Sequence, residues 1–190
     1  ANFKKILINK EGIKLDSYKK DIMDLGVKNN MDNFVNEVIN LKLCNSVVVD
    51  CTASNEIYLH YIRLLKNNIS VVTPNKKANS EKYSLYNNLV KYPRYYYETT
   101  VGAGLPVIET IKNIVKNGDK IIRIEAILSG TLSYIFNKYC EGNEKFSDIV
   151  KKAQELGFTE PNPVDDLSGM DVCRKILILS RIIGFKKEIE

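Results

Sequence analysis

The sequence of 190 residues has a single histidine, His60, and four cysteines that form no C-x-x-C pair. A structural zinc site requires a cluster of such side chains, so this composition excludes one. Because no cysteine has a pairing partner or a metal to bind, Cys44, Cys51, Cys140 and Cys173 are predicted to be buried thiols.

Long apolar runs are absent too. No stretch approaches the roughly 20 residues that cross a bilayer, and the first residues lack the charged-then-apolar order of a secretory signal. We therefore expect a globular, cytoplasmic protein with no membrane partner. The formal net charge of +5 comes from scattered lysines, several of them near acidic residues, so nucleic acid is not an expected partner either.

A third absence is the glycine-rich fingerprint of dinucleotide-binding proteins. Such proteins open with a strand and a G-x-G-x-x-G turn, whose backbone amides meet the pyrophosphate at a helix N-terminus. The only near match is G-A-G at 102–104, which follows a predicted strand late in the chain and precedes Pro106. We expect no pyrophosphate loop within these 190 residues.

The first half of the chain alternates strand-like and helix-like segments. Strands are predicted at 6–9, 46–50, 69–73 and 95–98, and helices at 15–24, 31–41, 55–67 and 80–91. This alternation predicts an α/β fold with a parallel sheet of Rossmann type, in which the β-branched run at 46–50 is a central strand. Ligands of such sheets bind at the carboxyl ends of the strands, where Thr52, residues 73–76 and residues 98–104 fall.

After Leu105 the pattern changes to that of an α+β domain. Helices are predicted at 106–117, 132–140, 146–156 and 166–183, with one long strand at 120–128. Within the last helix, Asp171 and Lys175 are four residues apart and share one face, next to an apolar stretch at 176–179. A lysine at the edge of apolar packing and beside a carboxylate can exchange protons near neutral pH. The alternative is an ordinary ion pair on a solvated face.

Four motifs follow one another along the chain. They are V-T-P-N-K-K-A-N at 72–79, E-T-T-V-G-A-G-L-P at 98–106, L-S-G-T-L-S-Y-I-F at 128–136, and E-P-N-P-V-D-D-L-S-G-M-D-V-C-R-K at 160–175. In this order and spacing the whole chain resembles homoserine dehydrogenases, in particular the dehydrogenase part of bifunctional aspartokinase/homoserine dehydrogenases. It departs from the usual E-P-D-P of that family at Asn162.

The resemblance implies reversible oxidation of L-homoserine to L-aspartate 4-semialdehyde with NAD or NADP, in threonine and methionine biosynthesis. Residues 1–104 would form an incomplete Rossmann-type dinucleotide-binding domain, and residues 105–190 part of an α+β substrate-binding and dimerisation domain. The family's fingerprint would then precede Ala1. A homodimer or higher homo-oligomer is expected, with the strand at 120–128 at its edge, and a plastid location if the parent protein comes from a plant.

The resemblance also implies roles for individual residues. Lys175 would exchange the proton of the substrate hydroxyl, and Lys76 would border both nicotinamide and substrate. The remaining assignments are substrate binding by Glu160, Asp166, Asp171 and Thr131, cofactor binding by Thr52, Lys76 and Gly157, and binding of a monovalent cation, Na⁺ or K⁺, by Glu98, Val101, Ala103 and Leu105.

Several alternatives stay open at this point. Gly157 can end the preceding helix, Asp165 can cap the following one, and Ser129 or Thr131 can cap the helix at 132–140. The alternative function is a non-catalytic dimerisation or regulatory scaffold derived from such an enzyme. Retention of both Lys76 and Lys175 argues against it, because a scaffold has no use for two lysines in a cleft.

Overall fold

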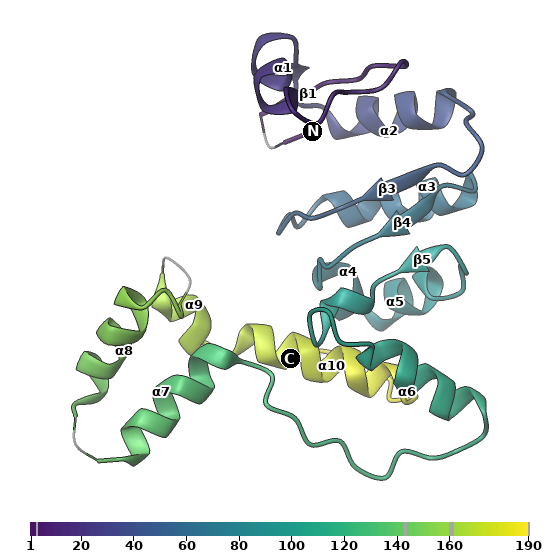
Figure 1. Ribbon diagram of the computed structural model, residues 1–190. Coiled ribbons are helices and arrows are strands. Elements are labelled where there is room, and N and C mark those ends of the chain that lie inside the picture. Colours follow the sequence, from purple (N-terminus) through teal and green to yellow (C-terminus); the bar gives the residue numbers. More distant parts are fainter. Residues whose placement is uncertain (3, 143, 160–161, 190) are drawn as a thin grey trace. The chain divides into compact units, whose positions relative to one another are not determined.

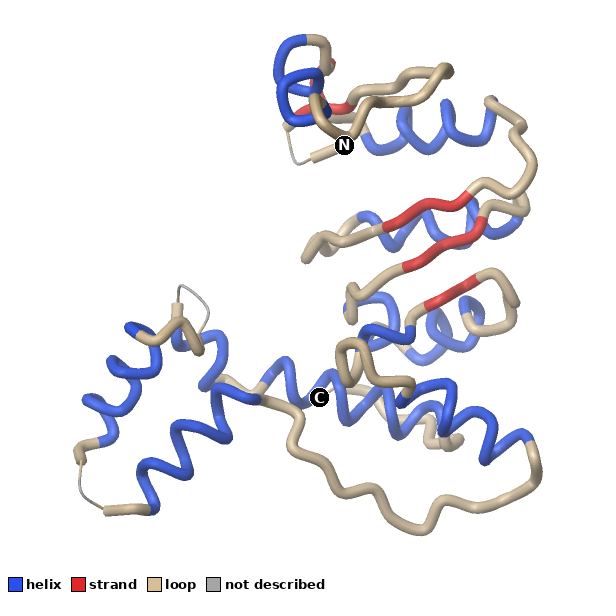
Figure 2. The backbone as a smooth tube through the Cα atoms, in the orientation of Figure 1, coloured by secondary structure: helices blue, strands red, loops and turns tan. Residues whose placement is uncertain are grey.

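The computed structural model describes residues 1–2, 4–142, 144–159 and 162–189. The chain forms two compact units, the first comprising residues 1–50, 54–72 and 89–96 and the second residues 51–53, 73–88 and 97–190. Figures 1 and 2 trace the helices and strands of each unit. No helix within the described ranges is both long and apolar enough to span a bilayer.

The first unit is built on a parallel sheet of β3 (Val47–Val49), β4 (Ser70–Val72) and β5 (Tyr95–Tyr96), in the order β3-β4-β5 (Figure 2). The predicted parallel arrangement is therefore confirmed. The prediction that β3 is central is wrong, because β4 is the strand with a partner on each side among the described residues. Val71 of β4 is fully buried, whereas Val47 and Val49 of β3 are exposed.

The helical segments of this unit lie at nearly the predicted positions. They are α1 (Tyr18–Asp24), α2 (Met31–Asn40), the 3-10 turn η1 (Ile57–His60) and α3 (Tyr61–Lys66). The Asn30 side chain caps α2 by accepting from the Asn33 amide at 3.0 Å. Tyr61 at the start of α3 is fully buried, and its hydroxyl donates to the carboxylate of Asp50, which follows β3 directly.

The N-terminal strand differs from the prediction. Instead of extending over 6–9 in the parallel sheet, β1 (Lys5–Ile6) pairs antiparallel with β2 (Val27–Lys28) in a separate two-stranded sheet. A turn in which the Gly12 amide donates to the Asn9 carbonyl follows β1, with Gly12 at φ +94°. The strand is therefore shorter than predicted. After this turn and α1, the chain runs back as β2, antiparallel to β1.

Helices make up most of the second unit. They are α4 (Lys77–Ser80), α5 (Tyr83–Leu89), the 3-10 turn η2 (Glu98–Thr100), α6 (Val107–Lys116), α7 (Gly130–Cys140), α8 (Phe146–Glu155), α9 (Pro163–Leu167) and α10 (Met170–Ile182). Helices α7 and α8 pack through Ile135, Ile149 and Ala153, all essentially without solvent exposure. The predicted helix at 166–183 is divided at Gly169, whose left-handed φ of +68° separates α9 from α10.

The strand predicted at 120–128 is not found in this unit. Residues 120–128 run in an extended conformation but form no strand, because an extended segment becomes a strand only through a hydrogen-bonded neighbour, and none of the described strands pairs with it (Figure 2).

The four cysteines, one in the first unit and three in the second, are exposed rather than buried. Each lies where a helix or strand begins or ends, and such positions face solvent more readily than mid-element ones: Cys44 before β3, Cys51 after β3, Cys140 at the end of α7, and Cys173 in the first turn of α10.

Candidate active site

The turn that carries Lys76 is tightly bonded. The Asn75 amide donates to the Thr73 hydroxyl at 2.9 Å, and the Asn75 side chain accepts from the Lys77 amide at 3.0 Å. The Lys76 carbonyl accepts from the Ser80 amide at 3.0 Å in the following helix, α4. Side-chain to backbone bonds of this kind fix turns. Lys76 is therefore presented from a turn with little freedom.

A single carboxylate joins the two lysines predicted to act in catalysis. Lys175 Nζ lies 2.6 Å from Asp171 Oδ2, and Lys76 Nζ lies 3.1 Å from Asp171 Oδ1. The i,i+4 pairing on α10 was predicted from the sequence, whereas the approach of Lys76 was not. The side chains of Lys175 and Lys76 are 19% and 27% exposed, and that of Asp171 is 50% exposed. The cluster is thus half-buried and open to solvent on the carboxylate side.

The two lysines determine the charge state of Asp171. Burial by itself disfavours the carboxylate, but the hydrogen bond from Lys175 and the positive charge of Lys76 outweigh it. Together they hold the pKa of Asp171 below its ordinary value. The carboxylate is accordingly charged at neutral pH and balances one of the two ammonium groups beside it.

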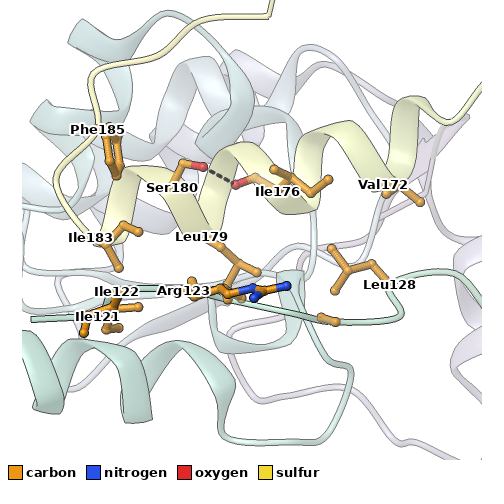
Figure 3. A pocket seen from close by; sticks show the side chains of 12 residues that line it. Ile121, Ile122, Arg123, Leu128, Val172, Ile176, Leu179, Ser180, Ile183 and Phe185 are labelled. Carbon is orange, nitrogen blue, oxygen red and sulfur yellow. Dashed lines mark hydrogen bonds between the residues drawn. The ribbon is translucent and has the colours of Figure 1, made fainter.

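Lys175 has a second acceptor outside α10. Its Nζ donates to the backbone carbonyl of Leu128 at 2.7 Å. Leu128 ends the extended segment 120–128, and this segment and α10 line a groove of about 350 Å³ (Figure 3). Apart from Arg123 and Ser180 the lining is apolar. A charged amino acid would find few partners there, so the lysine and carboxylate cluster is the better candidate for substrate chemistry.

The other predicted substrate residues lie on elements around α9 and α7. The Thr131 hydroxyl donates to the carbonyl of Phe158, and Ser129 caps α7 by accepting from the Leu132 amide at 3.2 Å. Asp166 lies on α9, two residues before its C-cap Ser168. The cap of α9 is Asn162 rather than Asp165, since the Asn162 side chain accepts from the Val164 amide. Glu160 lies outside the described residues.

Gly157 ends α8. At φ +73° its amide donates to the Gln154 carbonyl, and the next amide, of Phe158, donates to the Ala153 carbonyl. This pattern is the Schellman motif that terminates helices. The C-cap alternative for Gly157 is therefore confirmed, and it leaves a cofactor contact by the same backbone open.

In the loop predicted to hold a cation, the carboxylate of Glu98 is bonded to the start of α6, which the sequence did not predict. Glu98 uses both carboxylate oxygens to accept from the amides of Ile108 and Glu109, at 2.8 and 2.9 Å, and so caps α6. In the loop between Glu98 and α6, Gly102 and Ala103 adopt left-handed φ values of +83° and +50°. The carbonyl of Leu105 accepts from the Val107 amide at 2.8 Å, and Val101 is buried. Within the ranges described, no cluster of three or more His, Cys, Asp or Glu side chains could hold a metal ion.

Comparison with known proteins assigns the family. A family model described as homoserine dehydrogenase matches residues 106–190, and one for the NAD-binding domain of homoserine dehydrogenase matches residues 6–97. The chain belongs to the homoserine dehydrogenase family. Its parallel sheet lies in the part that matches the NAD-binding model, and the Asp171–Lys175 pair lies in the other.

Individual homoserine dehydrogenases are similar over most of the chain. The chloroplastic bifunctional aspartokinase/homoserine dehydrogenase 2 of Arabidopsis thaliana is 46% identical over 192 residues, covering 98% of this chain and 21% of the relative. The homoserine dehydrogenase of Schizosaccharomyces pombe is 49% identical over 152 residues, 75% of this chain and 40% of the relative. A hyperthermophilic archaeal homoserine dehydrogenase solved in complex with NADPH superposes with a TM-score of 0.73 at 26% identity, covering 93% of this chain and 56% of that one. The chain thus spans about a fifth of its bifunctional relative.

Three features of the candidate site escaped the sequence analysis. The supporting bonds of Thr73 and Asn75 have a local signal, since T-P-N-K combines turn formers with side chains that bond to nearby amides. The Leu128 carbonyl has no sequence signal, because every residue carries a backbone carbonyl. The third feature, Arg181, is buried within α10, and its partner Asn79 lies 102 residues away in the sequence.

Proposed function

We propose that this chain carries the catalytic cluster of a homoserine dehydrogenase that reversibly oxidises L-homoserine to L-aspartate 4-semialdehyde with NAD or NADP. The observation that supports the proposal is the bridging of Lys76 and Lys175 by Asp171. The reaction belongs to threonine and methionine biosynthesis. The proposed domains are the dinucleotide-binding part at 1–104 and the catalytic and dimerisation part at 105–190, in the cytoplasm or, as the name of the Arabidopsis relative suggests, in a plastid.

The two lysines are proposed to handle the proton transfer. In the oxidative direction, the neutral amine form of Lys175 accepts the proton of the substrate hydroxyl. In the reductive direction, the resulting ammonium returns that proton to the aldehyde oxygen. Lys175 already donates to two acceptors, so exchange of one of them for a substrate oxygen keeps the group bonded. Lys76 holds the other Asp171 oxygen and stabilises the negative charge that develops on the substrate oxygen.

The carboxylates are proposed to hold the substrate. Homoserine carries an α-ammonium group, which Glu160, Asp166 and Asp171 would attract. Asp171 can do so while it is bonded to the lysines, because each carboxylate oxygen accepts more than one hydrogen bond and half of the side chain is exposed. Thr131 would add a hydroxyl contact.

The residues at the strand ends are compatible with a dinucleotide. Thr52 follows β3 and Lys76 follows β4, both at the carboxyl ends where parallel α/β sheets bind such ligands. We propose that Thr52, Lys76 and Gly157 contact NAD or NADP, whose nicotinamide supplies hydride transfer at the substrate carbon. Glu98, with the backbone of Val101, Ala103 and Leu105, is proposed to border a Na⁺ or K⁺ ion, for which oxygen ligands are suitable.

The deciding experiment measures NADPH oxidation with aspartate semialdehyde by the full-length protein and by its Lys175→Ala variant. We expect the variant to lose activity by about 100-fold or more, the usual contribution of a general acid or base. Lys77→Ala, which removes the lysine next to Lys76, is the matched control and should stay near the wild type. A full-length protein that folds and dimerises without any activity would instead support the scaffold.

A further inference from the structure

Arg181, in the last turn of α10, uses its charged side chain to bond to three other residues. Its side chain has no solvent exposure. The guanidinium donates to the carbonyl of Asn79 at 2.7 Å, to the carbonyl of Lys187 at 2.9 and 3.1 Å, and to the carboxylate of Glu188 at 2.8 Å. Burial lowers the pKa of Arg181, against the charge of Glu188, but a guanidinium stays protonated.

Two tyrosines of α5 and the segment after α10 also surround the Arg181 guanidinium. The guanidinium carbon lies 5.8 Å from the ring centre of Tyr83 and 5.4 Å from that of Tyr86. The second oxygen of Glu188 accepts from the Tyr83 amide at 2.8 Å. Arg181 therefore ties α10 to α4, to α5 and to the segment that follows α10.

The bond to Asn79 reaches the turn that presents Lys76. Asn79 is three residues beyond Lys76, and its amide donates to the Lys76 carbonyl at 3.1 Å. Arg181 is ten residues beyond Asp171, about 15 Å along the helix. Helices α4 and α10 are consequently joined at two points, by Arg181 and Asn79 at one end of α10 and by Asp171 and Lys76 at the other.

These two joints differ in strength. The pair of Lys76 and Asp171 is partly exposed, and such ion pairs hold little geometry by themselves. The bonds of Arg181 are charge-assisted, multiple and buried. The stronger joint must therefore set the relation of the two helices, and the weaker one forms within it.

We propose that Arg181 is a positioning residue that fixes α10 against the α4 turn, so that Asp171 and Lys175 meet Lys76. This inference rests on the proposed function for its catalytic consequence, though not for its geometry. A lysine cannot replace Arg181, because an ammonium lacks the planar fork that reaches Asn79, Lys187 and Glu188 together.

The test compares Arg181→Lys with the wild type in the full-length protein. We follow the carboxyl titration of Asp171 by carbon NMR, and kcat and KM against pH. If Arg181 positions the cluster, the variant loosens the contact between Lys76 and Asp171, the Asp171 titration moves to higher pH, and kcat falls by about tenfold or more with a shifted pH profile.

Two controls separate positioning from stability. Ile178→Val removes one buried methyl group from the same helix. It should lower the melting temperature without changing the Arg181 bonds. Lys187→Ala removes an exposed side chain whose carbonyl alone bonds to Arg181. Both should leave the Asp171 titration and the pH profile unchanged. The proposal is overturned if Arg181→Lys behaves like Ile178→Val, with lower stability and no other change.

If Arg181→Lys does not fold, Glu188→Gln decides the question. It keeps the shape of the acceptor and removes its charge, so a smaller shift of the Asp171 titration in the same direction is expected, and no shift overturns the proposal. Because this titration requires no turnover, a wild type without dehydrogenase activity would refute the proposed function while the measured shift still tests the geometry.

Discussion

Asp171 is the residue on which the electrostatics of the cluster depend. Each of its oxygens faces one lysine, and the lysines keep its pKa below the ordinary value despite partial burial. Without this carboxylate, two ammonium groups would approach one another with no counter-charge. Asp171 is therefore required to keep the two lysine side chains together.

Asp171→Asn should lower the free energy of unfolding at neutral pH, since it leaves the two lysines without an anion. A carboxyl whose folded pKa is depressed stabilises the protein fully above its unfolded pKa, near 3.8, and loses that contribution as the pH falls through the folded value. The gap between wild type and variant should therefore narrow on acidification below about 3.8. Urea unfolding across this pH range measures it.

Asp165→Asn is the matched control, because Asp165 is an exposed carboxylate in the first turn of α9. The free energy of unfolding of Asp165→Asn should differ little from that of the wild type over the whole pH range. A gap for Asp171→Asn that is constant with pH would contradict the assigned charge state.

At the scale of single elements, the ends of helices account for much of the site's architecture. Gly169 separates α9 from α10, the Schellman turn at Gly157 ends α8, and Glu98 caps α6 from a distant 3-10 turn. Each of these ends satisfies backbone groups that a helix cannot satisfy internally. The loops that carry the proposed ligands are thus held by the helices they join.

Glu98→Ala should destabilise the protein by about 1–2 kcal/mol, because two amides in the first turn of α6 lose a charged acceptor. Chemical denaturation measures the loss. Glu109→Ala, an exposed carboxylate in the same turn, should cost about 0.5 kcal/mol or less. Equal effects of the two substitutions would show that general charge, and not the two hydrogen bonds, stabilises the helix.

At the scale of the whole molecule, the extended segment 120–128 exposes apolar side chains and has no strand partner among the described residues. Ile122 and Ile127 are 98% and 81% exposed, and the segment pairs with none of the described strands. Extended backbone with open hydrogen-bonding groups and apolar side chains favours pairing with another chain. These features support the proposed homodimer.

We expect Ile122→Lys to shift the full-length protein toward monomer, because a charge on the exposed apolar segment opposes association. Sedimentation velocity measures the shift, with circular dichroism to show that helix content is retained. Leu15→Lys, at an exposed apolar position of the other unit, is the control and should sediment like the wild type. A wild type that is monomeric at all concentrations would remove the basis for the dimer.

The sequence by itself determined what depends on neighbours along the chain. The apolar periods gave most helices and the parallel strands, and the spacing of Asp171 and Lys175 gave their pairing, because residues four apart on a helix must meet. The order of motifs gave the family, which the comparisons confirm.

The tertiary structure decided what depends on partners far away in the chain. It brought Lys76 to Asp171, bonded Arg181 to Asn79, and left residues 120–128 without a strand partner among the described residues. It also exposed cysteines that composition predicted to be buried. The physical reason is the same in each case: hydrogen bonds, ion pairs and burial depend on which surfaces meet, and a local pattern records only the preference of its own segment.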